Sequence, residues 1–275
     1  MSLAIYFKLF EVIFPVFFII GIGYWFGKKN PKFNSDIITT FAGKIGVPAL
    51  LFYSLAASTT LDFKTFFKFG SFTFLFVACF AVIGIVILKI LKRDIVLELS
   101  PLILPNTGNL GLPICLFAYG EKGFSVASSI AAVIMLLHFT VWIFIASKKF
   151  SLKPLITSIP MHVLFISGFM LYFEVKPPAF LVNTTMLLGY STIFLILTSL
   201  GIALSTLKTK NVNTNIILAV TRLISGPLIA FSIIRYFGLK SYEAGVLLIS
   251  ASMPLSFSLL SIFIDMRTCL DSHLS

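Results

Sequence analysis

The sequence predicts an all-α protein that crosses a membrane several times, and three observations predict this fold class. The 275 residues are 58% hydrophobic and only 11% charged, whereas a soluble domain is nearer half apolar and a quarter charged. Phenylalanine alone occurs 31 times, so much apolar surface must face something other than water. The apolar residues also come in stretches of about 20, the length with which a helix crosses ~30 Å of hydrocarbon.

Charged residues or Pro and Gly separate these stretches from one another. The first stretch lacks a small-residue cleavage site and is too long for the apolar core of a signal peptide, so we expect it to be a span. The loops are too short to fold alone, which leaves no room for a soluble domain. We expect nine spans, at residues 6–26, 37–57, 66–91, 99–119, 123–147, 155–175, 185–206, 214–237 and 242–264.

Lysine and arginine are unequally shared between the two sides of the predicted membrane. Twelve of them lie in the odd-numbered loops and after the last span, and seven lie at the N-terminus and in the even-numbered loops. Cytoplasmic loops carry the excess of positive residues, which predicts that the N-terminus is outside. The same bias explains the net charge of +11 without a nucleic-acid partner. Lys44 and Arg222 lie inside spans two and eight, and we expect them to snorkel to the cytoplasmic interface rather than to contact a substrate.

Two of the predicted spans are interrupted by proline. Span four contains "LPNTGNLGLP" (104–113), and span nine contains "SASMPLS" (250–256). A proline frees backbone groups of its helix, and these groups must face protein or a wet cavity rather than lipid. The two breaks are five spans apart, so their helices cross in opposite directions, which is typical of inverted repeats in transporters. This predicts a first repeat at 1–146, a cytoplasmic connecting loop at 147–154 and an incomplete second repeat at 155–275.

The two breaks predict a substrate site at mid-membrane. The N-termini of half-helices offer free N–H groups and the positive end of the helix dipole, both of which favour an anion. His138, near the middle of span five, either lines this pocket, relays a proton or is a neutral histidine bonded to a carbonyl. The alternative for each break is a structural kink, in which a neighbouring Ser or Thr forms hydrogen bonds with the freed backbone groups. The candidate substrate-binding residues are Pro105, Asn106, Thr107, Gly108, Asn109, His138, Ser252, Met253, Pro254 and Ser256.

Four segments, in order along the chain, resemble motifs of the auxin efflux carrier superfamily. They are "GVPALLF" (46–52), "NTGNLGLP" (106–113), "LTSLGIALS" (197–205) and "SASMPLS" (250–256). The resemblance is closest to short bacterial members, because the long cytoplasmic loop of many plant carriers is missing. It implies two inverted five-helix repeats, a bile-acid-symporter-like and NhaA-like fold in which helices four and nine are broken and cross at their prolines. It also implies a scaffold of spans one, two, six and seven, a mobile transport domain made of the other spans, and a homodimer. The sequence ends where the tenth span of that fold would begin.

No enzyme motif occurs in the sequence: there is no phosphate-binding loop with lysine, no H-E-x-x-H and no G-x-S-x-G. We expect no enzymatic activity, no cofactor and no metal site. The expected function is secondary transport of a small organic anion, such as an auxin-like, malate-like or malonate-like carboxylate, by elevator-type alternating access. The expected location is the bilayer of a bacterial inner membrane. The alternative is a sodium-coupled organic-anion symporter of the bile-acid type on the same fold.

Overall fold

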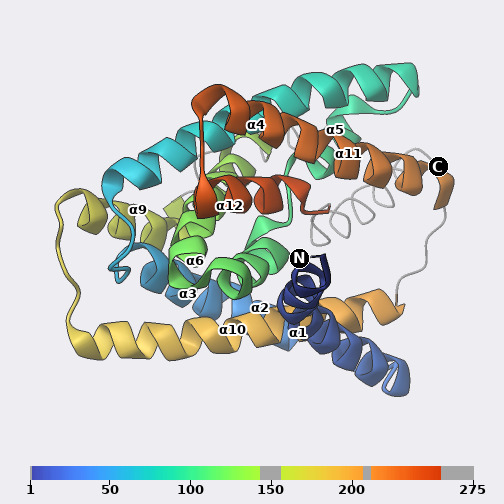
Figure 1. The fold of residues 1–275 in the computed structure, drawn as a ribbon. Coiled ribbons are helices and arrows are strands. Elements are labelled where there is room, and N and C mark those ends of the chain that lie inside the picture. The colour runs from blue at the N-terminus through green and yellow to red at the C-terminus, as the bar shows by residue number, and fades with distance from the viewer. Residues whose placement is uncertain (1, 143–155, 207–211, 255–275) are drawn as a thin grey trace.

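Helices make up nearly all of the chain that the structure describes. The computed structural model describes residues 2–142, 156–206 and 212–254. In these residues α4 and α11 lie along one side of the molecule and α10 along the opposite side, with α6 between them (Figure 1). The all-α fold class predicted from the sequence is therefore confirmed for the described residues.

Short π-helical turns, marked η, connect some of the α-helices and interrupt the regular helical repeat. In chain order the elements are α1 (Ser2–Lys29), α2 (Asp36–Phe41), η1 (Ala42–Gly46), α3 (Val47–Leu55), α4 (Phe63–Ile90), α5 (Ile95–Ile103), η2 (Thr107–Gly111), α6 (Leu112–Leu137), η3 (His138–Trp142), α9 (Ile159–Tyr172), α10 (Ala179–Thr206), α11 (Val212–Phe237) and α12 (Ser241–Ser252).

Six helical stretches in the described residues are long and apolar enough to cross a membrane. One of them, Thr107–Val141, contains a turn at Gly120, where φ is 63°, so it joins parts of the predicted spans four and five. The other departures from the nine predicted spans are short helices: α9 has 14 residues and α12 has 12. Residues 255–264 of the predicted ninth span lie outside the described residues. The nine-span arrangement stays a prediction.

The helices pack in two groups. In the first group, α10 lies against α1 and against α2, η1 and α3, and α9 packs against α3. In the second group, α4 packs against α5, α6 and α11, while α12 packs against α6 and α11. The groups meet mainly where α6 contacts α1 and α3 and where η2 contacts α10. Each group is thus built from segments far apart in the sequence.

Glycines allow α1 and α10 to approach to backbone contact. A Cβ atom on Gly201 of α10 would collide with the carbonyl oxygen of Ile20 and the amide nitrogen of Tyr24. A Cβ atom on Gly23 of α1 would likewise collide with the carbonyl oxygen of Thr198. Small residues at such positions bring membrane helices into close van der Waals contact. The α1–α10 pair therefore forms a tightly packed part of the first group.

The outer surface of the protein is apolar. Large hydrophobic side chains are exposed along α1, α4, α9 and α11, including Phe17 (61% exposed), Phe67 (65%) and Phe165 (57%). Phe10, Phe14 and Phe18 form a ladder of neighbouring rings along α1. An exposed apolar surface of this extent is unfavourable in water and suits contact with lipid chains, as expected for helices that cross a bilayer.

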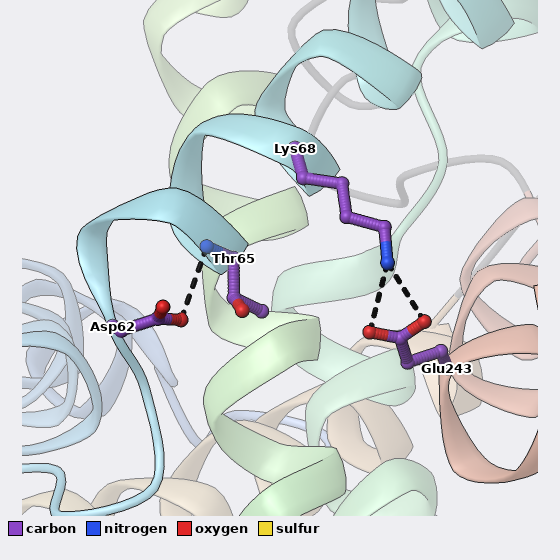
Figure 2. A network of polar contacts seen from close by, with 4 residues as sticks. All are labelled: Asp62, Thr65, Lys68 and Glu243. Carbon is purple, nitrogen blue, oxygen red and sulfur yellow. Dashed lines mark hydrogen bonds and ion pairs between the residues drawn. The ribbon is translucent and has the colours of Figure 1, made fainter.

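Polar contacts hold the start of α4 and the start of α12 (Figure 2). Asp62 caps α4 by accepting a hydrogen bond from the amide of Thr65 at 3.1 Å. Its interaction with the side chain of Thr65, and then this bond to the amide, lower the pKa of its carboxyl from the usual 3.8. One turn further on, the ammonium of Lys68 lies 2.8 Å from the carboxylate of Glu243 in α12. This half-exposed ion pair links two helices of the second group at one end.

The glycine contact predicts a site-specific loss of stability. Changing Gly201→Ala should destabilise the protein by about 1–3 kcal/mol, because the colliding atoms belong to the α1 backbone and cannot rotate away. The matched control is Gly21→Ala in α1, since a Cβ there meets nothing within 4 Å. Alanine favours a helix over glycine by about 1 kcal/mol, so this control should be neutral or stabilising. Thermal unfolding in detergent measures both, and equal melting temperatures would contradict the prediction.

Candidate functional site

The helix that begins at Ile95 is interrupted at the predicted place. α5 ends at Ile103, and the helix resumes with the turn η2 at Thr107. Pro105 explains the interruption, because proline disfavours helical geometry at the residue before it and donates no backbone hydrogen bond. The first hydrogen bonds of the new turn run from the amides of Leu110 and Gly111 to the carbonyl of Asn106. The amides of residues 107–109 precede those bonds and have no acceptor within the helix.

The end of α12 meets this interruption. The amide of Asn106 donates to the carbonyl of Pro254 at 3.0 Å. The hydroxyl of Thr107 donates to the carbonyl of Ser250 at 3.4 Å. These two bonds directly join the two proline-containing segments that were predicted to cross.

Arg222 of α11 connects the carbonyl ends of both interrupted helices. Its Nη1 donates to the carbonyls of Leu102 at 2.8 Å and Ile103 at 3.0 Å, at the end of α5. Its Nε donates to the carbonyl of Met253 at 3.2 Å, just after α12. The last carbonyls of a helix lack intrahelical partners, so one guanidinium satisfies backbone acceptors of two helices.

The prediction that Arg222 snorkels to the interface is wrong. Its side chain is 0% exposed, and its guanidinium lies 4.1 Å from the ring centre of Phe80 and 5.6 Å from that of Phe76. Among the residues that the structure describes, no carboxylate forms an ion pair with it, and its Nη2 has no hydrogen-bond partner. Hydrogen bonding to the backbone carbonyls is favoured over extension to the membrane surface, because these carbonyls need a donor that lipid cannot supply. Lys44, by contrast, is exposed.

A cavity of about 190 Å³ lies beside the interruption. It is bounded by α3 on one side and by the interrupted segment, α6 and η3 on the other. Most of its wall is apolar, and its polar side chains come from two asparagines and one histidine. The lining residues are Val47, Leu50, Leu51, Leu104, Pro105, Asn106, Gly108, Asn109, Leu112, Ala131, Ile134, Met135 and His138.

The structure gathers half of the predicted site residues around this cavity. Pro105, Asn106, Gly108, Asn109 and His138 all line it. Asn109 is half-buried and Gly108 is exposed, so this part of the wall is open to a ligand. His138 is also half-buried and packs edge-on against the neighbouring Phe139. A role in binding stays a prediction for each of these residues.

The remaining predicted residues lie elsewhere. Thr107 is fully buried and its hydroxyl is used in the bond to α12. Ser252 donates to the carbonyl of Leu248 in its own helix, and Met253 and Pro254 accept the bonds described above. None of these four residues belongs to the cavity lining. Ser256 lies outside the described residues.

Sequence reasoning missed two contributions to the site. The apolar wall comes partly from Leu50 and Leu51. They lie in the "GVPALLF" segment, which resembles a family motif but was not predicted to take part in the site. Arg222 was expected to reach the cytoplasmic interface because it lies near the end of its span. The available signal was that Arg222 is a lone charge among uncharged neighbours in an apolar span. A charge inside the membrane requires partners inside the protein.

A second hollow, of about 440 Å³, is larger but carries less chemistry. It lies between α4, α6 and α9. In the described part of the chain it is lined by Phe, Leu, Val, Ala and Gly and by one polar side chain, that of Ser71. Several of its phenylalanines, such as Phe74 and Phe169, are about half exposed or more. Because it lies away from the interruption and offers almost no hydrogen bonds, we place the candidate site at the smaller cavity.

Comparison with known proteins bears on what this arrangement does. The sequence profile of a family described as membrane transport proteins matches residues 8–153. An uncharacterized transporter of the archaeon Methanocaldococcus jannaschii is 27% identical over 268 residues, which cover 89% of this chain and 85% of the relative. The profile covers more than half of the chain and includes the interrupted helix. The chain belongs to this membrane transport protein family, of the auxin efflux carrier superfamily, and is an integral membrane transporter.

Proposed function

We propose that the protein is a secondary transporter of small organic anions, with its substrate site at the cavity beside the crossing. The observation that carries this proposal is the start of a helix at the cavity wall. The amides of residues 107–109 precede the first hydrogen bond of η2, and Gly108 and Asn109 line the cavity. A helix N-terminus carries about half a positive charge and binds carboxylates through free N–H groups.

The cavity wall also supports a recognition mode for carboxylates. The amide groups of Asn106 and Asn109 can donate to an oxygen, while the leucines of α3 and the apolar residues of α6 suit a carbon skeleton. Sites for small molecules commonly combine an apolar wall with a few directed polar groups. A cavity of about 190 Å³ suits a small acid.

The two helix groups support a mechanism of alternating access. The cavity lies at their boundary, since α3 belongs to the first group and η2 and α6 belong to the second. The division matches the scaffold and transport domain that the family resemblance implies. We propose that the second group moves against the first as an elevator and carries the interrupted helices with it.

The proposal includes an inverted repeat of nine or more spans in a bacterial inner membrane, with the N-terminus outside. Its support is the pair of proline-containing segments five spans apart, which the structure brings into contact at Asn106 and Pro254. The excess of Lys and Arg in odd-numbered loops supports the orientation.

Asn109 tests the substrate site. Changing Asn109→Ala removes a side-chain donor but leaves the backbone amide, so carboxylate affinity should fall by about 1.5–3 kcal/mol, or roughly ten- to more than hundredfold. Asn109→Asp should be worse, because it places a negative charge against an anion. Binding of labelled malate and malonate to purified variants measures both effects. Asn183→Ala, at an exposed position of α10, is the control and should bind as the unchanged protein does.

The same variants separate the alternative. In a sodium-coupled symporter, Asn109→Asp would strengthen the binding of sodium, since a carboxylate is a good ligand for a cation. Unchanged affinity in both Asn109 variants, at equal thermal stability, would reduce the interruption to a structural kink.

The orientation is tested by reporters fused into two loops. A reporter after Lys153 should be cytoplasmic, and one after Lys176 should be external, because the connecting loop carries three lysines and belongs to the positive side. Two reporters are fused at each position: a phosphatase that is active only outside the membrane, and a fluorescent protein that fluoresces only in the cytoplasm. The two signals should be opposite at the two positions. An external reporter after Lys153 would overturn both the orientation and the inverted-repeat assignment.

A further inference from the structure

We infer that Arg222 sets the charge preference of the cavity, by cancelling the negative ends of α5 and α12 so that an anion can occupy the site beside them. The inference rests on the proposed transport of organic anions and names the residue that makes the site tolerant of negative charge. Arg222 does not line the cavity. It acts on the potential at the cavity rather than by contact with the substrate.

Arg222 offsets the negative helix ends at the crossing, in addition to the partial positive charge at the start of η2. A helix C-terminus carries roughly half a negative charge, and both α5 and α12 end at the crossing. The two ends together carry about one negative charge. The guanidinium carries one positive charge and donates to carbonyls of both ends, namely those of Leu102, Ile103 and Met253.

The guanidinium is close enough to the cavity for this balance to matter. It binds the carbonyl of Ile103, and the chain enters the cavity wall at Leu104 and Pro105. Two residues span at most about 7 Å, so the guanidinium and both helix ends lie within about 10 Å of the wall. One unbalanced charge at that distance in a medium of intermediate dielectric changes the affinity for a singly charged anion about tenfold, equivalent to about 1.4 kcal/mol.

The surroundings of Arg222 keep its charge unshared. The helices packed around it contribute the aromatic rings of Phe76 and Phe80 from α4 and backbone carbonyls from α5 and α12. In the described part of the chain no carboxylate contacts it. A carboxylate partner would have cancelled the guanidinium and left the helix ends negative. Carbonyl partners leave the whole charge available to offset the dipoles.

A purely mechanical clamp makes a different prediction from a charge balance. Loss of a clamp would weaken all ligands of one shape alike, whereas loss of a charge weakens them in proportion to their own charge. Malonamide, malonamate and malonate have nearly the same shape and carry none, one and two negative charges. Their relative affinities within one variant therefore report the potential at the site, whatever the stability of that variant.

The experiment measures the affinities of these three compounds for the purified full chain and three variants. Arg222→Gln keeps a donor for one carbonyl but removes the charge. It should leave malonamide unchanged, weaken malonamate about tenfold and weaken malonate about a hundredfold. Arg222→Lys keeps the charge without the planar fork, and Phe80→Leu keeps Arg222 but removes the ring beneath it. Both should lower the melting temperature while preserving the order and spacing of the three affinities.

Each outcome decides between the accounts. If Arg222→Gln weakens the three compounds equally, or not at all, the charge inference is overturned. If Arg222→Gln does not fold, Arg222→Lys decides, because loss of the preference for malonate in a folded, positively charged variant also overturns it. If the unchanged protein binds no carboxylate in preference to its amide, the proposed anion transport itself fails, and the inference fails with it.

Discussion

The hydrogen bonds from Arg222 to the ends of α5 and α12 allow two interrupted helices to meet inside the protein. An unpaired carbonyl in an apolar interior costs several kcal/mol, and a guanidinium buried without acceptors is also strongly unfavourable. The guanidinium supplies donors to the carbonyls, and the carbonyls supply acceptors to the guanidinium. Phe80 covers the face of the guanidinium at 4.1 Å. The contact between the two interrupted helices, which includes the bond from Asn106 to Pro254, depends on this arrangement, and the cavity lies beside it.

The two helix groups differ in how their parts are joined. Within the first group, α1 and α10 touch through their backbones at glycines, which leaves little freedom for one helix to slide along the other. The second group is joined by the Arg222 bonds and by the ion pair of Lys68 with Glu243. Across the boundary Leu51 and Leu55 of α3 pack with Ala132 of α6. Polar contacts run from the hydroxyl of Tyr190 in α10 to the carboxylate of Glu121 in α6 and from the hydroxyl of Ser58, just after α3, to that of Ser125 in α6. The apolar part of this boundary is non-directional, which is compatible with the proposed movement between the groups.

Among the described residues, no lysine or arginine lines the cavity, and this has a consequence for the proposed transport. A bidentate arginine would hold a carboxylate strongly and slow its release. Amides of Asn106 and Asn109 and a helix N-terminus offer weaker interactions, of about 0.3–2 kcal/mol for the helix end. A positive charge placed behind the wall favours anions as a class without binding one directly. Moderate affinity of this kind is compatible with repeated release on the far side of a membrane.

The sequence by itself determined the all-helical membrane class, the approximate positions of the apolar helices and the break at Pro105, because these follow from local composition and from the geometry of proline. It also proposed Asn106 and Asn109 as site residues and left His138 open between lining the pocket, relaying a proton and a structural role, and all three line one cavity. Only the tertiary structure decided the partners of Arg222, because the carbonyls that attract it come from α5 and α12, more than 100 and about 30 residues away in the chain. The leucine wall from α3 was likewise decided by packing between helix groups, for an apolar residue in a membrane helix carries no local mark of whether it faces lipid, protein or a cavity.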